Sequence, residues 1–386
     1  MRASPLPEMC TTMNNTVYLD NAASSFPKPP CVFRAVLSAI SENAANPGRS
    51  GHFMSEQAAI RVFNARHTVA EYFGLSGGEE NVIFTLNATH AINTVINGVL
   101  QNGGHALISD MEHNSVLRPL EALSRRGNVR YDAVRTVTGG AADFIPAFRR
   151  DTKLVFVTHA SNVTGQMLDI ADIGKACRQR GILFAVDASQ TAGHLRYDLS
   201  KLPVDFVCTA GHKGLFGPQG TGLLLLNTKY PLPPLLYGGT GTMSMSAPQP
   251  QIRPEAYESG TVNTPGILGL AAGIDFLRKN ADALASNERN AYEYALTRLK
   301  KTDGITVLTP ENSISSLLAF NVRDLHSEKV TEILSQNGIC VRGGYHCSML
   351  MHRKLGTEAT GVVRASFGGF NTVTDAEKLI FCLKKC

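Results

Sequence analysis

Two wholly apolar segments, residues 154–157 and 182–186, constrain the fold of this chain more than any other feature. Neither alternates apolar with polar residues, so each predicts a strand that is buried on both faces, as in a parallel sheet covered by helices. An amphipathic stretch at 170–180 lies between them and ends at Gly181, which predicts a strand–helix–strand unit. The chain is therefore expected to be an α/β protein.

Composition excludes several classes of protein. The formal net charge of +5 is scattered along the chain without a lysine or arginine block, which argues against a nucleic-acid partner. No apolar run reaches membrane-spanning length, and the first residues lack the apolar core of a signal peptide. The eight cysteines form no CxxC pair, so we expect no metal site and a reducing, cytoplasmic location.

The stretch AGHKGLFGPQGTG, residues 210–222, places Lys213 shortly after the apolar segment 206–208. Burial disfavours the ammonium form of a lysine and frees a nucleophilic amine, which can form a Schiff base with a carbonyl. Asp187 directly follows the strand at 182–186, where an unpaired carboxylate would be costly. Each residue also has an ordinary interpretation: Lys213 as a surface lysine in a flexible turn, and Asp187 as a helix N-cap.

Two motifs connect the chain to a known family. Residues 204–224 resemble the signature of fold-type I pyridoxal phosphate (PLP) enzymes of the class V aminotransferase group. The stretch VRGGYHCSM, residues 341–349, resembles the catalytic-cysteine loop of cysteine desulfurases, nearest the type II, Suf-type branch. The resemblance extends from about Tyr18 to the C-terminus. Two separate motifs in the right order are far more specific than either alone.

This resemblance implies the PLP-dependent transferase fold of type I. A large domain with a mixed, mostly parallel sheet flanked by helices is expected at 31–264. A smaller α+β domain, which carries the cysteine loop, is expected from 15–30 and 265–386. Residues 1–14 are expected to form a flexible tail. The pattern after 265 also predicts two helices, at 267–278 and 282–301.

By the same resemblance, pyridoxal 5'-phosphate is attached to Lys213, and Asp187 keeps its ring nitrogen protonated. The turn at 85–90 opens a helix, where free N–H groups and the helix dipole favour a phosphate. The expected cofactor contacts are the N–H of Ala88, Thr89, His212, Gln190, Asn162, the stacking His113 and, from a neighbouring subunit, Thr261. The family carries hydroxyl residues where this chain has Ala88 and Ala210, so Thr209 is a candidate substitute for the second.

Cys347 is the expected nucleophile of the second motif. Arg342 and His346 are placed to lower the pKa of its thiol. Arg364, flanked by apolar residues, is the expected clamp for the substrate α-carboxylate, together with Asn162. His52, in the loop at 46–52, matches a family histidine at the entrance to the site. Without the family context, we would interpret His52 and His113 as surface residues, whereas the apolar flanks of Arg364 disfavour that interpretation.

The function that the resemblance implies is conversion of L-cysteine to L-alanine. Lys213 and His113 would move protons, and Cys347 would take the sulfur as a persulfide for iron–sulfur cluster or other sulfur-transfer pathways. The implied partners are L-cysteine, a second copy of the chain in a homodimer, and a sulfur-acceptor protein. A selenocysteine lyase on the same scaffold and a PLP-binding protein without catalysis remain open alternatives. A transaminase would have no use for the cysteine loop.

Overall fold

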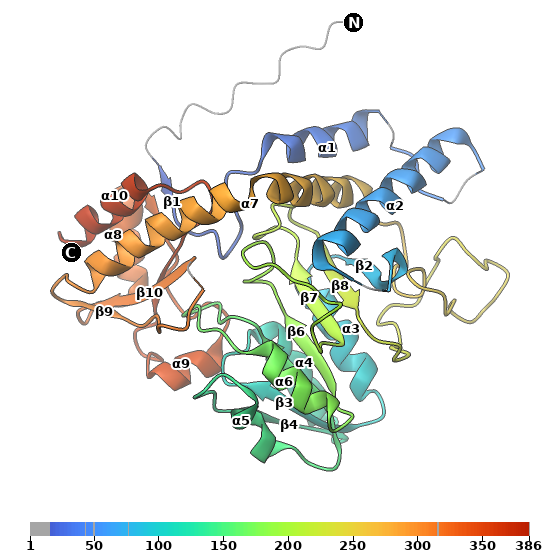
Figure 1. The fold of residues 1–386 in the computed structure, drawn as a ribbon, viewed down its shortest axis with the longest axis horizontal. Helices are drawn as coiled ribbons and strands as arrows, with labels where there is room; N and C mark the ends of the chain where they lie inside the picture. The colour runs from blue at the N-terminus through green and yellow to red at the C-terminus, as the bar shows by residue number, and fades with distance from the viewer. Residues whose placement is uncertain (1–15, 43, 49–50, 76, 315, 386) are drawn as a thin grey trace, which may run out of the picture.

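The structure, a computed structural model, describes residues 16–42, 44–48, 51–75, 77–314 and 316–385, so the expected tail at 1–14 lies outside the described residues. Its centre is a seven-stranded sheet (Figure 1). In spatial order the strands are β2 (Val82–Thr85), β8 (Gly222–Leu226), β7 (Phe206–Ala210), β6 (Leu183–Asp187), β5 (Thr152–Thr158), β3 (Gly104–Ser109) and β4 (Val129–Val134). Strand β8 runs in the direction opposite to the other six strands of this sheet, which are parallel to one another. The predicted α/β class and mixed, mostly parallel sheet are confirmed.

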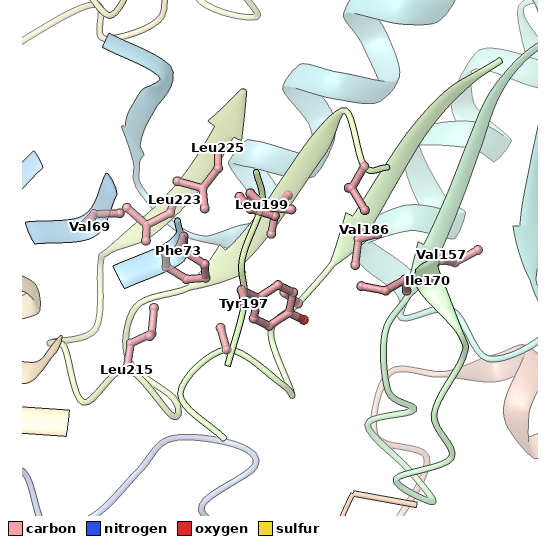
Figure 2. Packing of buried hydrophobic residues seen from close by; sticks show 14 of the residues in the cluster. Val69, Phe73, Val157, Ile170, Val186, Tyr197, Leu199, Leu215, Leu223 and Leu225 are labelled. Carbon is pink, nitrogen blue, oxygen red and sulfur yellow. The ribbon is translucent and has the colours of Figure 1, made fainter. Parts of the chain in front are cut away.

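Helices cover both faces of this sheet, which explains why its central strands are apolar throughout. On one face lie α3 (Ala88–Leu100) and α4 (Asn114–Arg125), which pack in one core with residues of the central strands. On the other face lie α2 (Phe53–Phe73) and α6 (Ile170–Arg178). Figure 2 shows this second core, where Phe73 of α2 lies beside Tyr197, with ring centroids 5.8 Å apart.

A smaller unit combines the two ends of the described chain. Its antiparallel sheet has the order β12 (Val363–Ser366), β10 (Leu317–Val322), β9 (Ile305–Val307). Beside it, β1 (Val17–Tyr18) pairs in parallel with β11 (Ile339–Cys340). The helices here are α8 (Ser327–Gln336), α9 (Met349–Leu355) and α10 (Val373–Leu383).

One long helix, α7 (Thr264–Leu299), joins the two units (Figure 1). The prediction of two helices at 267–278 and 282–301 is wrong, because the polar residues between them include no glycine or proline to stop a helix. Ile267 and Ile274 pack into the core of the large sheet, whereas Ala295 and Leu299 pack into the small core. The division into two domains therefore stays a proposal, with α7 common to both.

The remaining helices are α1 (Pro30–Ser41), which lies along α7, and the short α5 (Ala141–Phe144). Two single 3-10 turns lie at Glu79–Asn81 and Ile145–Ala147. Residues 227–263 form no helix or strand, as their glycines and prolines predict. None of the helices in the described ranges combines the length and apolar character needed to cross a membrane.

Candidate active site

A cavity of about 220 Å³ lies at the carboxyl ends of β5, β6 and β7. Ligands bind at such edges in α/β folds, because the loops after parallel strands converge there. Eight of the predicted residues line this one cavity: Ala88, Thr89, His113, Asn162, Asp187, Gln190, His212 and Lys213. The structure thus brings together residues that span 126 positions of the sequence, from 88 to 213.

Lys213 follows β7 in a tight turn. The N–H of Phe216 donates to the Lys213 carbonyl at 2.9 Å, and the N–H of Gly217 donates to the Gly211 carbonyl at 2.8 Å. Phe216 takes a φ of 59°, which is unusual for a residue with a side chain. Burial lowers the pKa of the Lys213 amine to about 8, although Asp187 opposes the shift. The amine is therefore easily freed for nucleophilic attack near neutral pH.

The cavity floor holds one buried carboxylate. Asp187 is only 5% exposed, and its Oδ1 accepts the N–H of Ser189 at 2.9 Å. Next to it, His113 caps α4, and its Nδ1 accepts the N–H of Ser115 at 3.0 Å. Because the Nδ1 lone pair is occupied, the proton of the neutral ring is on Nε2. Burial lowers the pKa of His113 to about 4, so the ring is neutral at physiological pH.

The other end of the cavity suits an anion. It contains the N-terminus of the 13-residue helix α3, and in the described part of the chain the N–H groups of Ala88 and Thr89 have no acceptor. Nδ1 of His212 and Oγ of Ser189 are buried and, among the described residues, unpaired. Buried polar atoms normally have partners. Orphaned donors at a helix N-terminus, a buried carboxylate and a low-pKa lysine together fit the phosphate, ring nitrogen and aldehyde of pyridoxal phosphate.

Arg364 lies behind the cavity and is 1% exposed. Its two terminal nitrogens donate at 2.8 Å to the Asn162 carbonyl and to Oδ1 of Asp20, while Nε is buried and has no partner among the described residues. Arg342 pairs with Arg364 through two backbone hydrogen bonds of 3.1 and 2.8 Å. The Nδ2 of Asn162 donates to the His346 carbonyl at 2.6 Å. These contacts join the expected carboxylate clamp to the cysteine loop.

Cys347 is the exposed thiol of the described chain. By contrast, burial raises the pKa of Cys177 to about 12 and that of Cys208 well above its usual range, which makes those thiols unreactive. The Cys347 carbonyl accepts the N–H of Asn114 at 2.7 Å, and Asn114 adjoins His113. The loop is therefore fastened at the edge of the cavity, although Cys347 does not line it.

The charge expected from His346 is not present at neutral pH. Burial, together with Arg364, lowers the pKa of His346 to about 3, and its Nε2 lies 2.9 Å from the Val362 carbonyl. A neutral imidazole supplies no positive charge to a neighbouring thiolate. Of the two residues expected to lower the pKa of the Cys347 thiol, only Arg342 is cationic.

Three predicted residues lie away from the cavity. Thr209 is buried in β7 and packs on the opposite face from Ala210, because side chains alternate along a strand. It does not line the cavity that Ala210 lines. His52 is exposed and caps α2, with the N–H of Ser55 at 3.3 Å from its Nδ1. Thr261 is exposed and lines a separate cavity of about 90 Å³.

The residues that sequence reasoning missed are Asp20, Ser115 and Ser189. Ser189 lies two positions after Asp187, so its place behind a strand end was a usable signal. Ser115 follows His113 in the same way, and its Oγ lies 2.8 Å from the histidine Nδ1. Asp20 also follows a short strand, but its partner Arg364 is 344 positions away, so nothing local indicated the ion pair.

Comparison with known proteins places these features in a family. Residues 17–379 match the family description of class V aminotransferases. A probable cysteine desulfurase of Methanothermobacter thermautotrophicus is 33% identical over 390 residues, which cover 98% of this chain and 96% of that protein. A cysteine desulfurase of Escherichia coli is 30% identical, with 95% of this chain and 92% of that protein covered.

Solved structures of cysteine desulfurases also resemble this chain. The apo structure of a cysteine desulfurase from Thermococcus onnurineus has a TM-score of 0.89 at 29% identity, covering 96% of this chain and 94% of that one. The crystal structure of the cysteine desulfurase CsdA from Escherichia coli has a TM-score of 0.86 at 27% identity, with the same shares covered.

Proposed function

The chain belongs to the class V aminotransferase family and, within it, to the cysteine desulfurases, and on this premise we propose how its residues act. The observation that carries the proposal is the meeting of three features at one sheet edge. Lys213 and Asp187 line the same cavity, and the loop of the exposed Cys347 is fastened at its rim. A cofactor-binding protein without catalysis would need no exposed thiol there.

We propose that Lys213 holds pyridoxal phosphate, with Asp187 at the ring nitrogen, His113 on the ring face, Gln190 at the 3-oxygen, and α3, His212 and Ser189 around the phosphate. When bound, this cofactor supplies an aldehyde and an electron-withdrawing ring that weakens bonds at the substrate α-carbon. Because this chain has Ala88 where the family has a hydroxyl residue, one hydroxyl contact to the phosphate is absent, whereas the backbone N–H of Ala88 is still available. Thr209 has no part in this proposal, because its side chain lies on the other face of β7.

Lys213 is the proposed base at the substrate α-carbon. A lysine with a pKa of about 8 can take up a proton near pH 7 to 8 and return it, since its pKa is close to the working pH. His113 presents Nε2–H in its neutral form and can donate a hydrogen bond from it within the cavity. Asp187 lines the cavity floor beside Lys213 and His113.

Asn162 and Arg364 are proposed to hold the substrate carboxylate. The unpartnered Nε of Arg364 is a buried donor without an acceptor among the described residues, which is costly until a ligand satisfies it. Arg342 adds a second cation beside Arg364. A planar guanidinium suits the two oxygens of a carboxylate better than an ammonium does.

Cys347 is proposed to attack the sulfur of L-cysteine as a thiolate. A sulfur–sulfur bond forms while the carbon–sulfur bond breaks, and the bond electrons stay with the substrate carbon. That carbon takes up a proton and leaves as the methyl group of L-alanine. The persulfide on the exposed Cys347 is then accessible to a sulfur-acceptor protein or to a small thiol.

The family resemblance also leads us to propose a homodimer with Thr261 beside the partner's cofactor. Phe33, Leu37 and Ile40 share one face of α1 and are 54%, 51% and 59% exposed. Phe53 and Phe63 of α2 are 72% and 56% exposed. Apolar side chains gathered on neighbouring helices indicate a surface that another protein covers.

The direct test is to incubate the PLP-loaded protein with L-cysteine and to measure alanine and sulfide, with and without a thiol reductant. We expect alanine in both cases and sulfide release that depends on the reductant, because the persulfide must be reduced. A protein that shows the cofactor absorbance but forms no alanine would be a binding protein only.

A further inference from the structure

The segment between β1 and α1 lies against the turn that carries Lys213. Its residues 20–28, which we call the N-terminal strap, contact the backbone carbonyls of His212 and Lys213. The Nζ of Lys28 donates to the His212 carbonyl at 2.6 Å and to Oγ of Ser25 at 2.8 Å. Oγ of Ser25 lies 2.8 Å from the Lys213 carbonyl, and the N–H of Ser25 lies 3.1 Å from the His212 carbonyl.

These contacts form one directed chain of hydrogen bonds. The single hydroxyl proton of Ser25 goes to the nearer carbonyl, that of Lys213, so its lone pair accepts from the Lys28 ammonium. A charged donor strengthens each bond that it makes. Lys28 thereby anchors the peptide groups on both sides of the Lys213 α-carbon.

The position of Lys28 is unusual for a cation. Its side chain is partly buried, and no carboxylate of the described residues lies within salt-bridge distance. Burial lowers its pKa to about 8. A desolvated ammonium held only by a carbonyl and a hydroxyl contributes little to stability, because its desolvation opposes the hydrogen bonds.

The turn has no room to adjust on its other side. A Cβ built on Gly214 would lie 2.4 Å from the Ala192 carbonyl oxygen and 2.9 Å from Nε2 of His194. One side of the turn is therefore fixed by close packing, whereas the other is fixed by the strap. Rotation of the peptide group at residue 212 or 213 would move the long Lys213 side chain, and the strap contacts oppose such a rotation.

We propose that Lys28 is a positioning residue for Lys213, acting through the His212 carbonyl and through Ser25. The role rests on the proposed function, in which Lys213 is the cofactor lysine. Lys28 itself touches neither cofactor nor substrate. Its charge and its hydrogen bonds hold the Lys213 amine in the desolvated cavity, beside the arginines Arg342 and Arg364.

The test compares Lys28→Met and Lys28→Arg with the control Lys329→Met, which removes an exposed lysine on α8 that pairs with Glu332. The cofactor-free full-length protein is labelled with acetic anhydride between pH 6 and 10, and acetylation of Lys213 is followed by mass spectrometry. In Lys28→Met we expect the pKa of Lys213 to rise by about half a unit, because the released turn lets the amine lose some of its desolvation. Labelling at pH 7 then falls about threefold.

Lys28→Arg should label like the wild type, since it keeps the charge and the donors, and Lys329→Met should not differ. The thermal midpoint of Lys28→Met should not fall, because methionine replaces a desolvated cation with an apolar chain of similar length. In the loaded enzyme, kcat should fall about threefold with KM for L-cysteine unchanged. Unchanged labelling in Lys28→Met, or equal losses in Lys28→Arg and Lys28→Met, would overturn the proposal.

The two proposals fail separately. Alanine formation by the wild type with unaltered Lys213 labelling in Lys28→Met would sink the role of Lys28 and keep the desulfurase function. If the wild type forms no alanine but the labelling of Lys213 differs between the wild type and Lys28→Met, the desulfurase function is refuted and the role of Lys28 is retained. The labelling assay needs no bound cofactor, so it reads the position of the amine in either case.

Discussion

The floor of the cavity and the cysteine loop differ in burial and in backbone conformation. On the floor, Asp187 ends strand β6 and His113 caps helix α4; Asp187 is buried, His113 is half-buried, and each has a defined hydrogen bond. In the loop, His346 and Cys347 take φ values of 48° and 56°, in the left-handed region that favours glycine. The thiol is exposed, although the backbone around it is fastened on both sides.

This difference matches two tasks of the proposed reaction. Charges that tune a cofactor must stay in place, because electrostatic effects depend on fixed positions in a desolvated site. A nucleophile that receives sulfur and passes it on must be reachable from the solvent as well as from the cavity. Backbone strain at such a position is common where function requires it.

The largest effect is expected when Lys213 is removed from the cavity. Lys213→Ala should lose the visible absorbance of covalently held cofactor and lower alanine formation by at least about a thousandfold, because both the attachment point and the base are gone. Absorbance spectroscopy and an alanine assay check this. Residual activity within tenfold of the wild type would show that another lysine holds the cofactor.

Removing the thiol should separate the two regions. Cys347→Ser should keep the cofactor absorbance yet lower sulfide release by at least about a hundredfold, because a hydroxyl is a far weaker nucleophile than a thiolate. Cys340→Ser, at a half-buried thiol of the same unit, is the matched control and should retain activity. Full sulfide release by Cys347→Ser would refute the assignment of the nucleophile.

Acid should destabilise both regions. Burial lowers the pKa of His159, near the floor, to about 4 and that of His346, in the loop, to about 3. Because these values lie below that of an unfolded histidine, the unfolded state binds more protons as the pH falls from about 6.5 towards 4, and stability is lost in that window. Above about pH 6.5, the two neutral rings make their full contribution to stability.

Urea unfolding of the cofactor-free protein at pH 7 and pH 5 measures this loss. His159→Asn and His346→Asn should each reduce the difference by at most about 2 kcal/mol. His326→Asn, at a half-buried histidine whose side chain is 41% exposed, serves as the control and should change the difference much less. An unaltered pH dependence in both buried variants would mean that these rings are not neutral in the folded state.

The smallest effect is expected when one hydrogen bond to His113 on the cavity floor is removed. Ser115→Ala removes the Oγ that lies 2.8 Å from Nδ1 of His113, but the backbone N–H at 3.0 Å still fixes the tautomer. We expect kcat to fall about two- to fivefold, in line with one hydrogen bond of about 0.5 to 1 kcal/mol. Steady-state kinetics check it, and a hundredfold loss would assign the hydroxyl a direct part in proton transfer.

The sequence predicted the floor well because local patterns determine it. Apolar runs predicted the buried strands, and Asp187, directly after one run, and Asn162, five positions after the other, had to meet at one edge of the sheet. The reversed strand β8, with the sequence GLLLL, could not be assigned from its pattern, since leucine favours a helix as readily. Thr209 was misleading because one position along a strand changes the face on which a side chain lies.

Contacts between distant segments escaped prediction altogether. Nothing near Asp20 indicates Arg364, and nothing near Lys28 indicates the His212 carbonyl, because tertiary packing alone makes these pairs. The motif around Cys347 identified the thiol by resemblance, but the neutral state of His346 follows only from its burial in the folded chain.

The parallel pairing of β1 with β11 has a consequence for biosynthesis. The ribosome makes Val17 early, yet its partner Ile339 appears more than 300 residues later. The last strand of the large sheet, β8, ends about 140 residues before β12 does, a delay of about 7 to 28 seconds at ordinary translation speeds. The nascent polypeptide can therefore complete all seven strands of the large sheet, which carry the proposed cofactor site, before Cys347 has been synthesised.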